Sequence, residues 1–216
     1  MNYSEALQKL ENCGQEHLLK YYEELSDVEK TALLEQIELT DFAVIEQGKS
    51  GESIKKGLIS PLESLELDAI NANKEEYTNM GIEAIKAGKV AAVLLAGGMG
   101  TRLGSDDPKG MYNIGKTKDV YIFQRIVENL MDVVKVVEKE IYLFVMTSDK
   151  NHTKTVNFFK EHNYFGYNEN YVKFFMQEMA PATDYEGKVY MESKSQISNS
   201  PNGNGGWFSS MKKWGI

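Results

Sequence analysis

A continuous apolar run between two glycines constrains the fold of this chain more than any other feature. Residues 89–96 read Lys-Val-Ala-Ala-Val-Leu-Leu-Ala, with Gly88 before them and Gly97 after them. The run does not alternate apolar and polar residues, which is typical of a strand covered on both faces of a parallel sheet. We therefore predict that this segment is a buried strand of an α/β domain.

Two further apolar segments continue the pattern. Residues 141–146 and 171–177 predict strands, and helical periodicity fills the segments before them, at 120–139 and 151–161. This alternation of strands and helices is typical of a doubly wound, mostly parallel α/β sheet. A sheet that stops after three or four strands exposes an apolar edge, so we expect an incomplete domain of this kind.

The first sixty residues differ in character from the rest. Apolar residues recur at helical spacing through residues 4–47, and Ser26, with a glutamate three positions later, begins a capping-box pattern. Residues 48–57 are polar and contain Gly and Ser, which is typical of a linker. The sequence therefore predicts a helical N-terminal arm at 1–60 and an incomplete Rossmann-like α/β domain at 61–216.

Three shorter elements are also expected. A helix begins at Asn73 and ends at Gly88, where glycine favours the left-handed backbone of a helix C-terminus. Residues 188–191 predict a short strand or hairpin. A final helix containing Trp207, Phe208 and Met211 would pack against the sheet.

The composition limits which ligands the chain can hold. Lys and Arg total 24 against 32 Asp and Glu, so the net charge is −8 and no broad basic face is available for nucleic acid. A single cysteine, Cys13, excludes an intrachain disulfide and a cysteine zinc site, and His17, His152 and His162 lack metal-ligand spacing. Apolar runs are too short to span a bilayer and the N-terminus lacks a signal-peptide pattern, so we expect a cytoplasmic protein.

The strand at 89–96 ends directly in a glycine-rich loop, Gly-Gly-Met-Gly-Thr-Arg, at residues 97–102. Glycines let the backbone approach an anion closely and present several N–H groups, which suits phosphate oxygens. Arg102 lies inside the loop and Lys109 follows Pro108, so two cations can lie near a triphosphate. This arrangement suits phosphoryl-group transfer. A glycine-rich turn that binds nothing is the alternative.

Two other phosphate-binding loops do not fit. A P-loop requires Gly, four residues and then Gly-Lys-Ser or Gly-Lys-Thr, which no segment of the chain provides. A dinucleotide fingerprint begun at Gly98 places Leu103 where its third glycine belongs. The strand at 141–146 also ends in Thr-Ser rather than in the acidic residue that contacts ribose in NAD enzymes. These departures disfavour an NAD-type dehydrogenase.

Residues 95–111, Leu-Ala-Gly-Gly-Met-Gly-Thr-Arg-Leu-Gly-Ser-Asp-Asp-Pro-Lys-Gly-Met, closely resemble the signature loop of the eukaryotic-type UDP-N-acetylglucosamine (UDP-N-acetylhexosamine) pyrophosphorylases. Shorter similarities follow in the order of that family, at 146–148, 164–166, 174–177 and 201–206. The chain is similar to the N-terminal portion of these enzymes. The resemblance implies a nucleotidyltransferase fold and favours an N-acetylhexosamine over glucose or galactose.

The resemblance implies roles at particular positions. Backbone atoms would hold the uridine and phosphates of UTP at Leu95, Ala96, Gly97 and Gly98. As catalytic residues, Arg102 would face the β- and γ-phosphates, and Lys109 would bind UTP and neutralise charge near the α-phosphate. The amide of Gln177 would read the uracil edge, Gly203 would let the base approach, and Asn204 would bind the sugar. Two alternatives stay open: Gln177 as a polar residue at a strand end, and Gly203 with Asn204 as a plain turn.

The implied reaction converts UTP and N-acetylglucosamine 1-phosphate into UDP-N-acetylglucosamine and pyrophosphate by in-line attack, with Mg²⁺ (or Mn²⁺) as cofactor. The metal-binding aspartate of the family and a second catalytic lysine are expected beyond Ile216, so metal ligands are unassigned. Two alternatives are a truncated, non-catalytic fragment that binds UTP or a UDP-sugar, and a related pyrophosphorylase acting on another hexose 1-phosphate.

Overall fold

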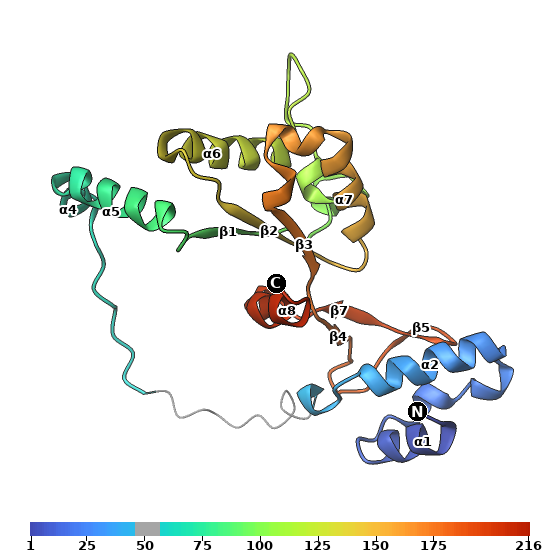
Figure 1. Cartoon of the computed structure of the whole chain (residues 1–216). Helices are drawn as coiled ribbons and strands as arrows, with labels where there is room; N and C mark the ends of the chain where they lie inside the picture. The colour runs from blue at the N-terminus through green and yellow to red at the C-terminus, as the bar shows by residue number, and fades with distance from the viewer. Residues whose placement is uncertain (46–56) are drawn as a thin grey trace. The chain divides into compact units, whose positions relative to one another are not determined.

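The computed structural model describes residues 1–45 and 57–216. The chain divides into two compact units (Figure 1). The first contains Met1–Ser60 and Met179–Asn202, and the second contains Pro61–Glu178 and Gly203–Ile216.

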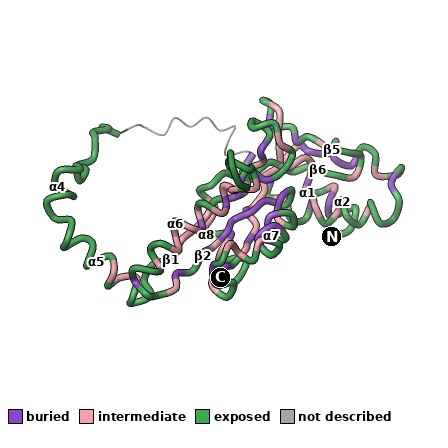
Figure 2. The backbone as a smooth tube through the Cα atoms, turned by 90° about the horizontal axis from the view of Figure 1, so that it is seen from above, coloured by how far each residue is buried: buried purple, intermediate pink, exposed green. Residues whose placement is uncertain are grey.

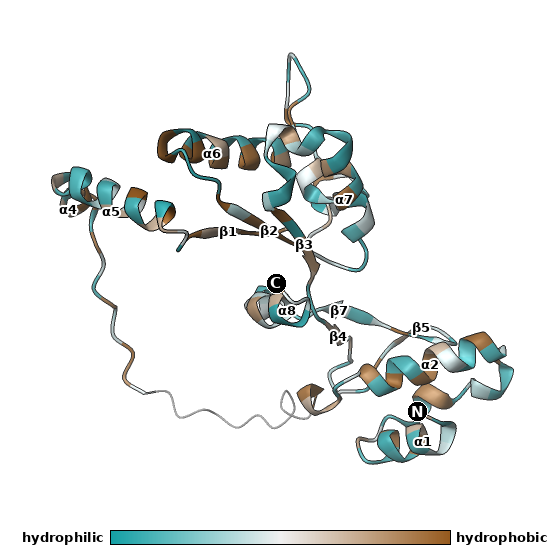
Figure 3. Cartoon of the chain, in the orientation of Figure 1, coloured by the Kyte–Doolittle hydropathy of each residue, from teal (hydrophilic) through white to brown (hydrophobic). Residues whose placement is uncertain are grey.

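A three-stranded parallel sheet forms the centre of the second unit. Its strands are β1 (Ala91–Leu95), β2 (Tyr142–Thr147) and β3 (Val172–Met176), hydrogen-bonded in the order β1-β2-β3. Each parallel connection contains a helix, α6 (Ile122–Val137) between β1 and β2 and α7 (His152–Glu161) between β2 and β3. The predicted alternation of strands and helices is confirmed, and hydrophobic residues run along all three strands (Figure 3).

Both connecting helices cover the same face of the sheet, since successive right-handed crossovers to adjacent strands place them there (Figure 1). Phe123 and Val127 of α6 and Phe158 and Phe159 of α7 are buried together against the strands. The C-terminal helix α8 (Trp207–Lys213) contacts β3, as the sequence predicts for residues 207–211.

The first strand is less buried than the sequence predicts. Within β1 the outer residues are exposed and the middle three are half-buried, and Leu95 is 42% exposed. In the part of the chain that the structure describes, β1 lies at the sheet edge and pairs with β2 alone. The expectation of a strand covered on both faces is therefore wrong for β1, although its parallel pairing is confirmed.

Two helices precede β1. The helix α5 (Lys74–Lys86) begins after Asn73 and ends before Gly88, whose φ of 70° confirms the left-handed helix end. The Asn73 side chain does not cap α5, and its Nδ2 donates to the carbonyl of Ala69 in α4 (Leu67–Ala72). The sequence reading missed α4, and both helices are largely exposed (Figure 2).

The first unit is built on α1 (Tyr3–Glu11) and α2 (Asp27–Leu39), joined by the short 3₁₀ helices Glu16–Leu19 and Tyr22–Glu24. The capping box at Ser26 is present as predicted. Gly14, with a φ of 66°, separates α1 from the first 3₁₀ helix. The predicted linker at 48–57 falls almost wholly outside the described residues.

A β-rich excursion, residues 179–202, completes the first unit. It contains two antiparallel pairs, β4 (Met179–Pro181) with β7 (Asn199–Pro201) and β5 (Met191–Ser193) with β6 (Gln196–Ile197). The buried Gln15 side chain donates to the carbonyl of Gly187 and accepts from the amide of Val189. Gln36 bonds the backbone of Ser195 and Ile197 in the same way. The excursion therefore packs on the N-terminal helices, whereas the sequence reading grouped it with residues 61–216.

No helix among residues 1–45 and 57–216 is long and apolar enough to cross a membrane.

Candidate functional site

The carboxyl ends of the three parallel strands meet at one edge of the sheet. Ala96 follows β1, Ser148 follows β2 and Gln177 follows β3. The sheet hydrogen bonding extends one residue past the strand ends, because Ala96 N–H donates to Met146 at 2.7 Å and Gln177 N–H donates to Thr147 at 2.8 Å. In open α/β sheets ligands bind at this edge, so the residues that follow these strands are the candidate site.

The glycine-rich loop after β1 closes on itself. Gly100 N–H donates to Asp107 at 2.8 Å, Lys109 N–H donates to Gly98 at 3.2 Å, and Met99 and Pro108 form an antiparallel bridge. These bonds bring Lys109 back beside the start of the loop, as the sequence reading required of a cation beyond the proline. Gly100 suits this turn because an added Cβ would lie 3.0 Å from the Asp107 carbonyl oxygen.

The start of the loop presents free backbone donors. Within the described ranges, the N–H groups of Gly97, Gly98 and Met99 have no hydrogen-bond acceptor. A Cβ added to Gly98 would meet no protein atom within 4 Å, so open space adjoins this backbone. Successive unpaired amides form a concave binding site for anions. The loop therefore has the donors that a phosphate group requires.

Two exposed cations accompany these amides. Arg102 lies in the 3₁₀ turn Thr101–Leu103 and Lys109 begins the turn Lys109–Met111. In the part of the chain that the structure describes, neither side chain forms an ion pair or hydrogen bond with protein. Asp107, the acidic residue that closes the loop, is instead paired with Lys154 of α7 at 2.9 Å. Both cations are therefore available to an anionic ligand.

Gln177 lies against the first glycine of the loop. The residue as a whole is 7% exposed, and its carboxamide has no hydrogen-bond partner among the described residues. A Cβ added to Gly97 would lie 2.5 Å from Nε2 of Gln177 and 3.2 Å from its Oε1. A polar residue that merely ends a strand normally turns its amide to water or to protein. The Gln177 carboxamide packs on Gly97 without a hydrogen bond to the described protein, so its donor and acceptor are open to water or to a ligand.

The segment that contains Gly203 and Asn204 lies at the start of the final helical region. Gly203 has a φ of 79°, which glycine adopts without strain, and Asn204 is exposed in the 3₁₀ turn Asn204–Gly206. Ser210 of the following helix accepts from Glu178 N–H at 3.2 Å, which ties this region to the residue after Gln177. The positive φ of Gly203 is by itself a sufficient reason for glycine at this position. No protein atom lies within 4 Å of a Cβ added to Gly203, so packing against the protein does not require glycine there.

Sequence reasoning missed Asn151, a residue with no exposed surface. It lies directly before α7, and its Nδ2 donates to the carbonyl of Ala96 at 3.0 Å. Buried polar residues after a parallel strand are a usable signal, but single-sequence periodicity does not show which of them turns toward the site.

Metal ligands are not assembled in the described part of the chain. No group of three or more His, Cys, Asp or Glu side chains there could hold a metal ion. Of the acidic residues near the loop and strand ends, Asp107 is paired with Lys154 and Glu178 lies 3.6 Å from Lys213. The residues present therefore do not form a metal site by themselves.

The parallel sheet and its glycine loop match solved structures of UDP-sugar pyrophosphorylases, which identifies a nucleotidyltransferase fold. The chain belongs to the UTP–glucose-1-phosphate uridylyltransferase family, whose sequence pattern matches residues 39–216.

Individual relatives carry more specific names. UDP-N-acetylglucosamine diphosphorylase 2 of Arabidopsis thaliana is 34% identical over 95% of this chain and 45% of its own length. UDP-N-acetylglucosamine pyrophosphorylase of Saccharomyces cerevisiae is 39% identical over 95% of this chain and 44% of its own. The crystal structure of the Trypanosoma brucei UDP-N-acetylglucosamine pyrophosphorylase matches 96% of this chain and 44% of that one, with a TM-score of 0.73 and 29% identity.

The resemblance seen in the sequence is thus confirmed. The chain spans slightly less than half the length of the relatives it matches.

Proposed function

We propose that this chain binds UTP at the carboxyl edge of its sheet and supplies the nucleotide-binding part of a UTP:N-acetyl-α-D-glucosamine-1-phosphate uridylyltransferase. The observation that carries the proposal is the contact between the unpaired amide of Gln177 and Gly97, at the start of a row of free backbone donors. The relatives named for UDP-N-acetylglucosamine support N-acetylglucosamine 1-phosphate as the sugar substrate. The same names support an enzyme of UDP-N-acetylglucosamine synthesis, and we propose a cytoplasmic location for it.

In this proposal the triphosphate lies along the loop. The backbone of Leu95, Ala96, Gly97 and Gly98 holds the uridine and phosphates, with the free N–H groups donating to phosphate oxygens. Arg102 binds the β- and γ-phosphates, because a guanidinium fits two phosphate oxygens at once. Lys109, held beside Gly98 by its backbone bond, neutralises charge at the α-phosphate.

The base and the sugar are bound by the segments after β3. Gln177 donates to one uracil oxygen and accepts from the ring N–H, a pair of bonds that a carboxamide can make together. Gly203 offers an unhindered backbone to the base, and Asn204 has the donors and acceptors to bind the hexosamine hydroxyls.

The chemistry requires alignment and positive charge. A phosphate oxygen of N-acetylglucosamine 1-phosphate attacks the α-phosphorus, the bond from that phosphorus to the bridging oxygen breaks, and pyrophosphate leaves with the electron pair. Lys109 and Arg102 stabilise the charge that develops on the attacked and leaving groups. Mg²⁺ (or Mn²⁺), when bound, would neutralise phosphate charge, and we assign it no ligand in this chain.

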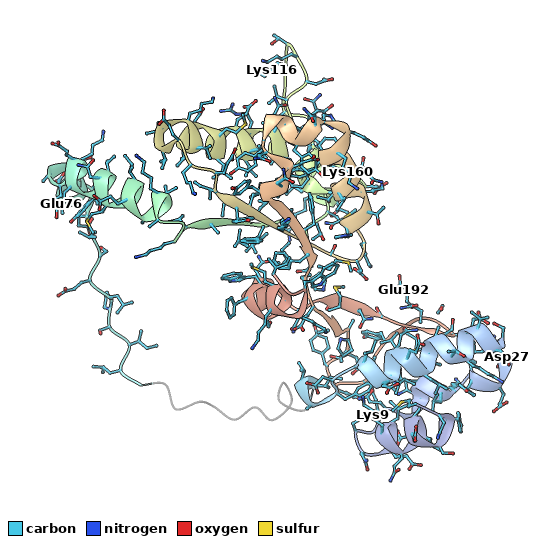
Figure 4. The ribbon with its side chains drawn as sticks, in the orientation of Figure 1. Lys9, Asp27, Glu76, Lys116, Lys160 and Glu192 are labelled. Carbon is cyan, nitrogen blue, oxygen red and sulfur yellow. The ribbon has the colours of Figure 1, made fainter. Side chains whose placement is uncertain are left out.

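A thermal shift assay with UTP and Mg²⁺ tests the proposal. Ligand at about a hundredfold excess over Kd stabilises a protein by about 2.7 kcal/mol, or about 5–10 °C for a chain of this size. We expect that rise for the unmodified chain and its loss in Lys109→Ala. Lys160→Ala, an exposed lysine on α7, is the matched control and should keep the rise (Figure 4). No UTP-dependent shift in well-folded protein would contradict the proposal.

A second candidate is a non-catalytic fragment that binds UTP or a UDP-sugar. It is favoured by the length of the chain, which covers 44–45% of its relatives. Pyrophosphate release from UTP and N-acetylglucosamine 1-phosphate separates the candidates, since the fragment would bind UTP without releasing pyrophosphate. Running the same assay with glucose, galactose and N-acetylgalactosamine 1-phosphates tests whether a related hexose phosphate is the substrate.

A further inference from the structure

The residue before α7 breaks the usual rule for its position. Asn151 is the N-cap of α7, where asparagine normally accepts a hydrogen bond from the first turn of its own helix. Its side chain makes no such bond. The side chain has no exposed surface, so it turns instead into the protein. A residue that breaks a local rule commonly serves a contact elsewhere.

The carboxamide of Asn151 is fully used by the loop and the end of β2. Its Oδ1 accepts from Ser148 N–H at 2.9 Å, while Nδ2 donates to the carbonyl oxygen of Ala96 at 3.0 Å and to that of Gly98 at 3.5 Å. The donor and acceptor ends are therefore fixed by their partners. The Asn151 side chain therefore links the end of β2 at Ser148 to the start of the glycine loop at Ala96 and Gly98.

These bonds determine where the loop amides point. In a planar trans peptide the N–H points opposite to the carbonyl of the same unit, and the described backbone contains no cis peptide bond. Turning the Ala96 carbonyl toward Asn151 directs the Gly97 N–H away from it. The Gly98 carbonyl accepts from both Lys109 N–H at 3.2 Å and Asn151 Nδ2 at 3.5 Å, and these two bonds together direct the Met99 N–H. Gly97 and Met99 are two of the unpaired amides of the candidate site.

We propose that Asn151 is a positioning residue: its buried carboxamide turns the Ala96 and Gly98 carbonyls inward and so holds the Gly97 and Met99 amides toward the phosphates of the nucleotide. This inference rests on the proposed function for the identity of the ligand. Glycine loops are flexible, and an anion site works best when its donors are fixed before the ligand binds.

A second link between α7 and the loop serves as a comparison. The ion pair of Lys154 with Asp107 joins the same helix to the far side of the loop, but both side chains are more than half exposed. Exposed pairs contribute little to structure. The bond from Asn151 Nδ2 to the Ala96 carbonyl is buried instead.

Replacement of Asn151 with Asp separates positioning from helix capping. Aspartate is a good N-cap and keeps an oxygen for Ser148 N–H, but it loses both donors and faces two carbonyl oxygens. If Asn151 only capped α7, Asn151→Asp would bind UTP normally. Asn151→Ser, a second good cap too short to reach Ala96, gives the same comparison without a buried charge. Asn157→Asp on the exposed face of α7 is the matched control.

The experiment is UTP titration calorimetry on the full chain, at a temperature where each variant is folded, with ¹⁵N spectra of ligand-free protein recorded beside it. We expect Asn151→Asp and Asn151→Ser to weaken UTP binding by about tenfold or more, and Asn157→Asp and Lys154→Ala by less than about twofold. In the ligand-free spectra, only the Asn151 variants should shift the Gly97 and Met99 amide signals.

The outcomes are distinguishable. If the unmodified chain binds UTP and the Asn151 variants bind it equally well, the positioning role is overturned and the proposed function stands. If the unmodified chain does not bind UTP, the proposed function falls, and the ligand-free spectra still decide the positioning. Unchanged Gly97 and Met99 signals in both Asn151 variants would overturn the inference in either case.

Discussion

The contact between Gly97 and Gln177 leads to a prediction about Gly97→Ala. A Cβ at this position would lie 2.5 Å from Nε2, 3.0 Å from Cδ and 3.2 Å from Oε1 of Gln177. Ordinary contacts of a Cβ begin at 3.4 Å, so the carboxamide must retreat by about 0.9 Å. It can do so because it is the free end of a flexible side chain. The variant should therefore fold with its glutamine displaced.

The magnitudes favour a loss of binding over a loss of stability. A displaced side-chain torsion costs about 0.5–1.5 kcal/mol, and replacing glycine with alanine at an ordinary backbone angle recovers about 0.4–1 kcal/mol. Stability should therefore change little. Two neutral hydrogen bonds to uracil are worth about 1–3 kcal/mol together, so their loss should weaken UTP binding by roughly 5- to 150-fold.

A double-mutant cycle with UTP titration tests this reasoning. If the methyl group acts through Gln177, Gly97→Ala should add little further loss in a Gln177→Ala background, because the displaced group is already absent. Gly81→Ala, at an open position in α5, is the control for the same chemical change. Additive losses in the double variant, or normal UTP binding by Gly97→Ala, would refute the reasoning.

Three further outcomes are expected. Gly110→Ala should destabilise the chain by about 1–3 kcal/mol or more in urea melts, because its Cβ would overlap the buried ring of Phe123; an unchanged midpoint would contradict that packing. Burial lowers the pKa of His152 below its ordinary value of 6.5, so the unfolded state binds more protons than the folded state near that pH. The free energy of unfolding should therefore fall as the pH drops below about 6.5. His152→Gln should reduce this dependence of the unfolding free energy on pH. Arg102→Ala should weaken UTP binding about tenfold or more, with a smaller loss at high salt, and equal losses at both salts would argue against a charge contact.

Periodicity and glycine positions predicted much of the fold. The apolar runs located three parallel strands, although β1 is exposed at both ends and half-buried between them rather than covered on both faces. Gly88 ended its helix as expected, and Ser26 formed its capping box. These signals are local, since neighbouring residues determine them.

Long-range features could not be predicted in this way. The excursion at 179–202 packs on the N-terminal helices through Gln15 and Gln36, two ordinary polar residues in helical sequence. The edge position of β1 depends on which strands pair, which its own composition does not reveal.

In the candidate site, too, local features could be predicted from the sequence and long-range contacts could not. The closure of the loop that returns Lys109 to Gly98 follows from its sequence spacing, and the structure bears it out. The contact of Gln177 with Gly97 joins residues 80 positions apart in the sequence. Asn151 was missed because its contact with the loop depends on the direction of its side-chain amide, which residue spacing does not predict.

A UTP titration followed by ¹⁵N spectra of the full chain, with Mg²⁺ present, tests the central claim most directly. The account predicts saturable shifts of the Gly97, Gly98 and Met99 backbone amides together with the side-chain NH₂ of Gln177, all with one Kd. Lys160→Ala should leave them unchanged, whereas Lys109→Ala should raise that Kd. Absence of shifts, or shifts confined to residues away from this edge of the sheet, would contradict a UTP site at the glycine-rich loop.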